Sequence, residues 1–255
     1  MSILILKDKK YFMKAFKAFS QRGQVTFEIQ RDFMIISALN APYLYIMFSN
    51  DIYSLDVPVE FTVEADEIIK NLELIGSNVI LLKESLRIVK FVNFQPDYTD
   101  EGLFDSEKYD LFDQYNYSFV DIPFANPIKS YYCLHKNFST KFLLKKDVLK
   151  IMLNGPVKYQ NSDKLILKKI GLGSEEIMEI DVDYLANGFL DFSCSNTWLS
   201  LVSTFYDLVD TVLFGFNDNF MTVKFILENY KNTYIEIQIQ EMEYFTRSAD
   251  PAQIF

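Results

Sequence analysis

The chain has 255 residues, enough for one large domain or two of about 125 residues, and 49% of them are hydrophobic, as in globular proteins with a substantial core. Eight glycines and seven prolines are too few for long disordered linkers, and two cysteines without metal or redox spacing are typical of a reducing compartment. The N-terminal apolar run is too short for a signal peptide, and no stretch approaches the roughly 20 apolar residues of a membrane span, so we expect a soluble intracellular protein.

The net charge of −10 by itself argues against a nucleic-acid partner. The acids are unevenly distributed, however. Between Asp97 and Asp113 there are seven acids and one base, Lys108, so this tract alone carries −6 and the remaining sequence carries −4. A basic surface elsewhere in the chain is therefore compatible with the composition.

The first half of the chain predicts a short strand at 3–6 and a helix at about 9–20. Alternating segments typical of half-buried strands follow at 24–30, 33–38 and 43–48. A strand at 60–63 leads into an apolar-periodic helix at 64–75, which ends at Gly76, and strands follow at 79–82 and 87–92.

The second half repeats this order. It predicts a strand at 140–144, a helix at about 145–154, strands at 164–170, 176–181 and 190–193, a helix at 196–210, and strands at 211–214, 222–226 and 233–239. Equivalent segments are offset by 134 to 137 positions, as between Val89-Lys90-Phe91 and Val223-Lys224-Phe225. Two unrelated α+β stretches would also give some of these matches, but four in the same order favour a duplication.

The duplication predicts an α+β fold built from two repeated β-rich units, each with two helices on one face of antiparallel sheets. We place the first unit at 1–122, an interdomain connector at 123–137 and the second unit at 138–255. Pro123 and Pro127 favour an extended connector, because proline fixes φ and removes a ladder donor.

The first predicted helix has a basic and an aromatic face. Lys10, Lys14 and Lys17 recur at i, i+4 and i+7, and the phenylalanines at 12, 16 and 19 recur at the same spacing. We expect the aromatic face to pack on the sheet and the basic face to point outward.

Lysines recur at the equivalent place in the second unit, which favours a phosphate-facing surface over an ordinary solvated face, although both interpretations stay open. The helix at 64–75 is mostly acidic, and the helix at 196–210 carries acids and no base, so such a surface is only partly basic. The predicted DNA-facing lysines are Lys9, Lys10, Lys14, Lys17, Lys70, Lys145, Lys146 and Lys150.

Three segments carry a family resemblance: Met34 to Ile46, Phe61 to Gly76, and Tyr234 to Ile239 with the aromatic tail at Tyr244-Phe245. Nearly the whole chain resembles the eukaryotic sliding-clamp family, which includes proliferating cell nuclear antigen (PCNA) and the checkpoint clamp loaded at damaged DNA. The resemblance implies a trimeric DNA-clamp ring in the nucleus, with helices lining the hole and sheets outside. It also implies double-stranded DNA as a sequence-independent partner, two further clamp subunits, no catalysis, no cofactor and no metal.

The resemblance further implies that a clamp loader and polymerase or repair proteins dock through short peptides on the outer face. The residues implied there are Leu39, Pro42, Tyr43, Ile122, Pro123, Phe124, Tyr244 and Phe245. For any one of these aromatic residues, local packing is an equally good explanation.

Three features depart from PCNA: its connector is not recognisable at 123–137, the acidic tract is long, and the turn Gln21 to Gln24 is short, as in the checkpoint type. We therefore predict a subunit of a heterotrimeric checkpoint clamp, with a homotrimeric polymerase processivity factor as the alternative.

Other function classes are weaker. Cys133 and His135 lack a third orienting group for nucleophilic catalysis, and Gly171-Leu172-Gly173 lacks the rest of a nucleotide motif. Asp181 and Asp183 offer two carboxylates to a metal, so an acidic hydrolase or nuclease stays as an alternative that needs a third converging acid. A scaffold that binds a basic partner through the acidic, aromatic tract at 97–117 is another.

Overall fold

The computed structural model describes residues 2–38, 40, 42–91, 117–126, 137–170, 176–217 and 219–242. No helix in these ranges is long and apolar enough to cross a membrane. The predicted features that lie outside the described residues are Leu39, the acidic tract at 97–113, connector residues 127–136 with Cys133 and His135, Gly171 to Gly173, and the tail with Tyr244 and Phe245.

The first unit alternates strands with two helical segments. Its elements are β1 (Ser2–Leu6), α1 (Lys9–Phe16), the 3-10 helix η1 (Lys17–Phe19), β2 (Gln24–Ile29), β3 (Phe33–Ala38), β4 (Tyr43–Ser49), β5 (Tyr53–Leu55), β6 (Val59–Glu64), α2 (Ala65–Ile75), β7 (Val79–Leu82), β8 (Ser85–Phe91) and β9 (Tyr117–Pro123).

The second unit repeats the strands but shortens the helices. Its elements are β10 (Thr140–Lys145), η4 (Lys146–Lys150), β11 (Pro156–Asn161), β12 (Leu165–Lys169), β13 (Ile177–Ile180), β14 (Asp183–Asn187), β15 (Asp191–Ser195), η5 (Asn196–Trp198), α4 (Leu199–Val202), η6 (Tyr206–Leu208), β16 (Val209–Phe216), β17 (Phe220–Leu227) and β18 (Tyr234–Gln240).

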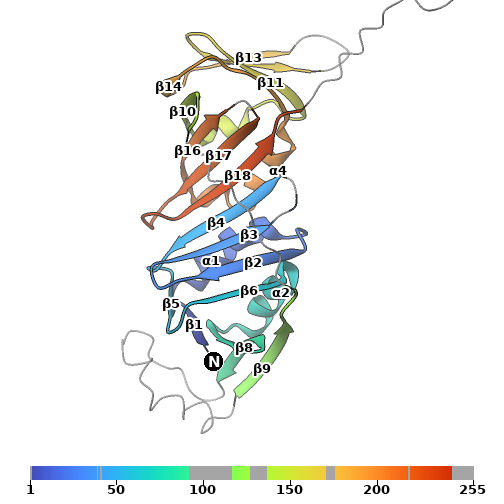
Figure 1. The fold of residues 1–255 in the computed structure, drawn as a ribbon, viewed down its shortest axis with the longest axis vertical. Coiled ribbons are helices and arrows are strands. Elements are labelled where there is room, and N and C mark those ends of the chain that lie inside the picture. The colour runs from blue at the N-terminus through green and yellow to red at the C-terminus, as the bar shows by residue number, and fades with distance from the viewer. Residues whose placement is uncertain are drawn as a thin grey trace, which may run out of the picture.

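The described strands form three antiparallel sheets along an elongated molecule (Figure 1). Two smaller sheets have the orders β5-β1-β7-β8-β9 and β13-β12-β11-β15. A sheet of nine strands, in the order β14-β10-β16-β17-β18-β4-β3-β2-β6, runs through both units. The units join where β18 pairs with β4, with Ile237 opposite Leu44.

The ladders confirm the predicted repeat of two β-rich units. β1 lies between β5 and β7 as β10 lies between β14 and β16, and β2 lies between β3 and β6 as β11 lies between β12 and β15. Gly23 and Gly155 occupy equivalent turns with φ of 72° and 84°, a region that favours glycine. Each accepts a backbone hydrogen bond at its carbonyl, from Ala65 (2.9 Å) and from Asn196 (2.7 Å). The exact unit boundaries stay predictions.

The aromatic face of the first helix packs inward as predicted. Phe12, Phe16 and Phe19 are buried, and the rings of Phe12 and Phe16 stack with centroids 5.4 Å apart. In the second unit the buried Trp198, which lies in the counterpart of α2, contacts Phe214 and Phe225 at centroid distances of 6.1 Å each. Both units thus bury large rings between helical segments and sheet.

The helix predicted at 145–154 is wrong in extent, because only Lys146–Lys150 is helical and its conformation is 3-10. Residues 7–23 connect β1 to β2, whereas the shorter stretch 146–155 connects β10 to β11. The shorter stretch must reach the turn at Gly155 and return to the sheet, which leaves less length for a helix than in the first unit.

The helix predicted at 196–210 is also broken, into η5, α4 and η6, and β16 already begins at Val209. Side-chain hydroxyls explain the break. Ser200 donates to the Thr197 carbonyl at 2.8 Å, Ser203 to the Ser200 carbonyl at 2.7 Å, and Thr204 to the Leu201 carbonyl at 2.8 Å. These bonds occupy carbonyls that an α-helical backbone would use and so favour irregular turns.

Candidate nucleic-acid interface

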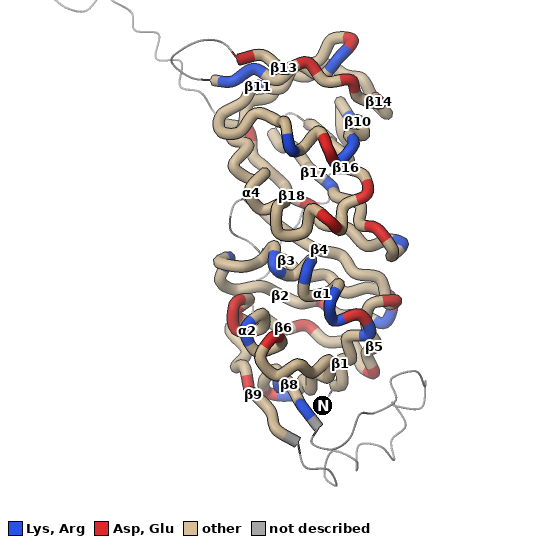
Figure 2. Tube along the Cα trace, turned by 180° about the vertical axis from the view of Figure 1, so that it is seen from behind, with Lys and Arg blue, Asp and Glu red and all other residues tan. Residues whose placement is uncertain are grey.

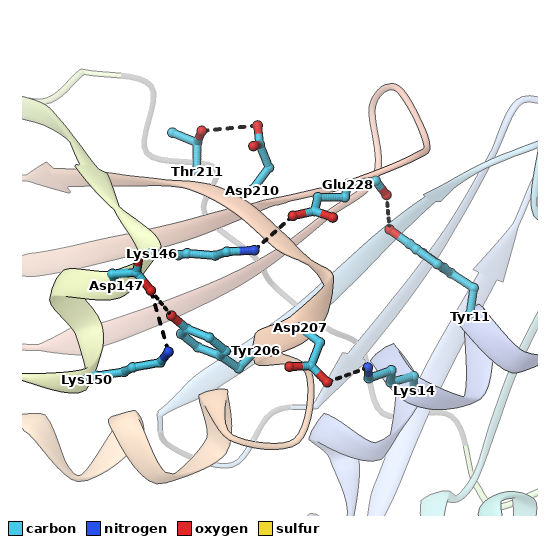
Figure 3. Close-up of polar contacts among 10 residues, drawn as sticks. All are labelled: Tyr11, Lys14, Lys146, Asp147, Lys150, Tyr206, Asp207, Asp210, Thr211 and Glu228. Atoms are coloured by element: carbon cyan, nitrogen blue, oxygen red, sulfur yellow. Dashed lines mark hydrogen bonds and ion pairs between the residues drawn. The ribbon is translucent and has the colours of Figure 1, made fainter.

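The helical segments of both units lie on the same side of the nine-stranded sheet, where Figure 2 shows α1 in front of the strands. We call the surface formed by α1, η1, α2, η4, α4 and η6 the helical face. Polar contacts link the units here, and Figure 3 shows those of Tyr11 with Glu228 and of Lys14 with Asp207. All eight lysines predicted to face DNA belong to this surface or border it.

In the first unit, two of these lysines are held by α2. The Nζ of Lys9 donates to the Leu72 carbonyl at 2.6 Å, near the negative end of the helix dipole, and burial lowers the pKa of Lys9. The Nζ of Lys17 lies 2.7 Å from a carboxylate oxygen of Glu73. Lys9 is therefore a half-buried cap of α2, and its predicted contact with DNA stays a prediction.

Lys14 is paired across the junction of the two units. Its Nζ lies 2.8 Å from Oδ2 of Asp207 in η6, and this hydrogen bond lowers the pKa of the Asp207 carboxyl. Beside it, the Tyr11 hydroxyl donates to the Glu228 carbonyl at 2.7 Å (Figure 3). The junction is thus held by side chains as well as by the β4–β18 ladder.

The lysines of η4 are also paired. The Nζ of Lys146 lies 2.9 Å from Glu228, whose hydrogen bond raises the pKa of Lys146. The Nζ of Lys150 lies 3.5 Å from Asp147 and 4.5 Å from the ring centre of Tyr206. The Tyr206 hydroxyl donates to Asp147 at 2.8 Å and lowers the pKa of that carboxyl.

Three predicted lysines remain without such a partner. Lys10, Lys70 and Lys145 are exposed and form no ion pair with any residue in the described ranges. Sequence reasoning identified the lysines but not the acids that hold them. Asp207 lies 193 positions from Lys14, and the i, i+3 spacing of Asp147 and Lys150 was the one local signal.

The predicted docking residues are divided by the fold. Pro42 and Tyr43, at the start of β4, line a cavity of about 260 Å³ at the end of β18, together with Trp198, Ile239 and Met242. The cavity has apolar walls at the surface, as a groove for a short apolar peptide would.

The docking residues beside β9 behave differently. Ile122 is 1% exposed and belongs to the core, so it offers no side chain to a partner, which corrects its predicted role. Pro123 is the last residue of β9, and the Phe124 ring stacks on Phe61 with centroids 5.1 Å apart. Local packing therefore accounts for Phe124.

Asp181 and Asp183 line a cavity of about 650 Å³ that also includes Asp147 and Asp210. Lys145 and Lys146 line the same cavity, and the Nζ of Lys164 lies 3.5 Å from Asp181. Within the described ranges, no three His, Cys, Asp or Glu side chains lie close enough together to hold a metal ion. Asp147 and Asp210 thus share the cavity with the predicted pair but do not form a metal-binding cluster with it in the described residues.

The fold of this chain is similar to that of known proteins, although no protein-family model and no curated protein matches its sequence. Among solved structures, a chain of the PCNA2–PCNA3 complex from Sulfolobus tokodaii is similar with a TM-score of 0.67 at 11% identity, over 94% of this chain and 99% of that chain. The match in length and the repeated topology agree, and the chain has the fold of the PCNA-like DNA sliding clamps.

Proposed function

We propose that this chain is a subunit of a three-chain ring that encircles double-stranded DNA and tethers other proteins to it. The observation that carries the proposal is a pair of strand edges left open by the duplication. Within the chain, β4 of the first unit pairs with β18 of the second. Their counterparts in the other units, β13 and β9, each end a sheet and lie at opposite ends of the molecule (Figure 1).

Two equivalent hydrogen bonds fix how the units superimpose. The Ala125 N–H donates to the Thr62 carbonyl at 2.8 Å, and the Met242 N–H donates to the Ser193 carbonyl at 2.8 Å. The first bond joins the segment just after β9 to β6, and the second joins the segment just after β18 to β15. Ala125 therefore corresponds to Met242, and Thr62 corresponds to Ser193.

From these anchors, the register of a junction between chains follows. Phe119 in β9 corresponds to Glu236 in β18, because each lies six positions before its anchor. The ladders connect Thr62 in β6, through β2 and β3, to Tyr45 in β4. In the same way they connect Ser193 in β15, through β11 and β12, to Ile177 in β13. Ile177 is therefore the counterpart of Tyr45. Because Glu236 lies opposite Tyr45 within the chain, the same junction between chains sets Phe119 opposite Ile177.

This register matches the exposed apolar residues of the two edges. Phe119 is 45% exposed and Ile177 is 51% exposed in the single chain. Cross-strand apolar pairs of this kind stabilise a ladder, and pairing the edges also removes a risk of uncontrolled strand addition. Repetition of one head-to-tail junction generates a ring when its rotation closes.

Three chains fit the size of the hole. A hole of roughly 35 Å clears a hydrated duplex, and helices about 10–12 Å wide then need about twelve to line it. Each unit has two helical regions, so each chain contributes four of the twelve. The similar Sulfolobus tokodaii structure is a complex of two PCNA chains, which supports assembly from several chains.

The complementary pair of Phe119 and Ile177 belongs to one sequence and favours closure by three copies, the processivity-factor form of the proposal. The second candidate is the subunit of a heterotrimeric checkpoint clamp, which the short turn from Gln21 to Gln24 favours. In both cases we propose a nuclear protein, with polymerase, repair or clamp-loader peptides docking at the cavity beside Tyr43.

Threading tests encirclement without a clamp loader. Duplex DNA is fixed to beads at one end, and its free end is blocked either before or after the chain is added. A ring enters only through a free end, so we expect retention in high salt only when the block follows the protein. Equal retention in both orders would mean that the protein binds the side of the duplex and would overturn the proposal. The Phe119→Glu variant, which opens the junction, should lose retention. Phe189→Glu changes a still more exposed ring (86% against 45%) away from β9 and β13 and should keep it.

A further inference from the structure

We infer that the helical face is neutralised by acids of its own chain, so that it confines a duplex through few contacts, made by Lys10, Lys70 and Lys145. The inference rests on the proposed function and states how that surface meets DNA. It follows from which lysines are already held and which are not.

Four of the eight predicted lysines are matched by one carboxylate each. Glu73 holds Lys17, Asp207 holds Lys14, Glu228 holds Lys146, and Asp147 holds Lys150, at distances of 2.7 to 3.5 Å. Lys9 is held by the Leu72 carbonyl. The remaining lysines, Lys10, Lys70 and Lys145, come from three different segments, so the available charge is spread over the face.

The strength of each pair does not by itself exclude exchange for a phosphate. Exposed ion pairs are worth only about 0.2–1 kcal/mol, and Lys14 and Asp207 are 38% and 77% exposed. A phosphate that took Lys14, however, would leave the Asp207 carboxylate facing the DNA. Like charges at a few ångströms repel, so the exchange gains little. The acids thus limit binding more by repelling phosphate than by holding lysine.

Weak contact suits a ring that must move along its track. Each phosphate that a protein neutralises releases counterions and makes the affinity fall more steeply with salt, by a slope of about −0.9 in log K against log salt. Three available lysines predict a slope of about −3 for each chain, whereas all eight would give about −7. The ring's closure, rather than its charge, then keeps the protein on DNA.

The test frees two lysines without adding any. Asp207→Asn and Glu73→Gln together release Lys14 and Lys17, and binding of the full-length chain to a fluorescein-labelled duplex is measured by anisotropy at several salt concentrations. We expect the slope to steepen by about 2 and affinity at low salt to rise at least tenfold. The matched control is Asp191→Asn, which frees Lys158 (2.8 Å) on the sheet surface opposite the core. It removes one acid and frees one lysine, as each of the two test substitutions does, and should leave the slope unchanged.

A complementary set of variants removes lysines. Replacing Lys10, Lys70 and Lys145 by alanine should bring the slope close to zero, and replacing Lys14 and Lys17 should leave it unchanged. An equal effect of Asp191→Asn, an unchanged slope in the Asp207 and Glu73 double variant, or no duplex binding by any version would overturn the inference. The threading experiment separates the two proposals, because a ring retained on blocked DNA with an unchanged slope contradicts this inference alone.

Discussion

The two units of the chain share their sheets and differ in their helices. In the first unit, α1 and α2 are regular helices; α1 and the adjoining η1 bury Phe12, Phe16 and Phe19, and α2 buries Ile68 and Leu72. In the second, short 3-10 segments and the four-residue α4 cover an otherwise equivalent set of strands, with Trp198 as the main packing group. The comparison teaches that this fold depends on strand pairing and buried rings, and that the helical layer can shrink while those are kept.

The largest expected effect on stability comes from removing the buried ring of Trp198, the main packing group of the short helical segments in the second unit. Trp198→Ala should lower the free energy of unfolding by about 3–5 kcal/mol, as should Phe16→Ala in the first unit, because each leaves a large cavity. Urea denaturation checks both. The control is Phe189→Ala, which is 86% exposed and should change stability by less than about 0.5 kcal/mol. A cost below about 1 kcal/mol for Trp198→Ala would show that the second unit does not rely on this ring.

The next largest effect on stability is expected at Asn196, which lies at the centre of a buried hydrogen-bond network where the first unit begins a regular helix. Its Oδ1 accepts from the Tyr159 hydroxyl at 2.6 Å and from the Trp198 indole at 3.1 Å, and its Nδ2 donates to the Leu153 carbonyl at 2.8 Å. Asn196→Ala leaves these groups unsatisfied and should cost about 3 kcal/mol in urea unfolding.

The equivalent position in the first unit is Ala65, which begins α2 and needs no such network. Asn71→Ala, which removes an exposed side chain of α2, serves as the control for loss of an asparagine and should change stability by less than about 0.5 kcal/mol. Equal costs for the two asparagine variants would contradict the role given to Asn196.

A smaller effect should follow from making the second unit resemble the first. Replacing Ser200, Ser203 and Thr204 by alanine removes the hydroxyl bonds to backbone carbonyls and adds helix propensity. We expect stronger circular dichroism at 222 nm and a gain in stability of about 0.5–1 kcal/mol. Unchanged helicity would mean that the hydroxyls do not break this helix.

The smallest expected effect is at the ion pair between the units. A double-mutant cycle on Lys14 and Asp207 should give a coupling energy below about 1 kcal/mol, because both groups are substantially exposed to solvent. The coupling should weaken further at 1 M salt, where screening acts within about 3 Å. A coupling of several kcal/mol would assign this pair a structural role that its exposure does not support.

Sequence periodicity predicted the repeat and most strands, because alternation of apolar residues reports directly on a half-buried sheet. It missed β14, whose residues alternate only between exposed and half-buried and leave no apolar pattern. It missed β11, which begins at Pro156, a residue that ordinarily argues against a strand. It overestimated the helices of the second unit, since periodicity does not register the length available between strands or the competing hydroxyl bonds.

The candidate interface was predictable only in part, for a similar reason. The spacing of Lys10, Lys14 and Lys17 in the sequence defines a face of one helix, and burial of the phenylalanines confirms its orientation. The acids that neutralise the face come from other elements, so no local pattern reveals that Glu73 and Asp207 lie beside α1. Closeness in the fold, not spacing in the chain, determines how much charge is left for DNA.

The most direct test of the account is the mass of the purified chain in solution, measured by light scattering behind a sizing column. Pairing of β9 with β13, in the register that joins β18 to β4, predicts a mass of about three times the 29.9 kDa chain, with Phe119→Glu reducing it to that of a single chain. A single-chain mass for the unaltered protein at every concentration would contradict closure by three copies.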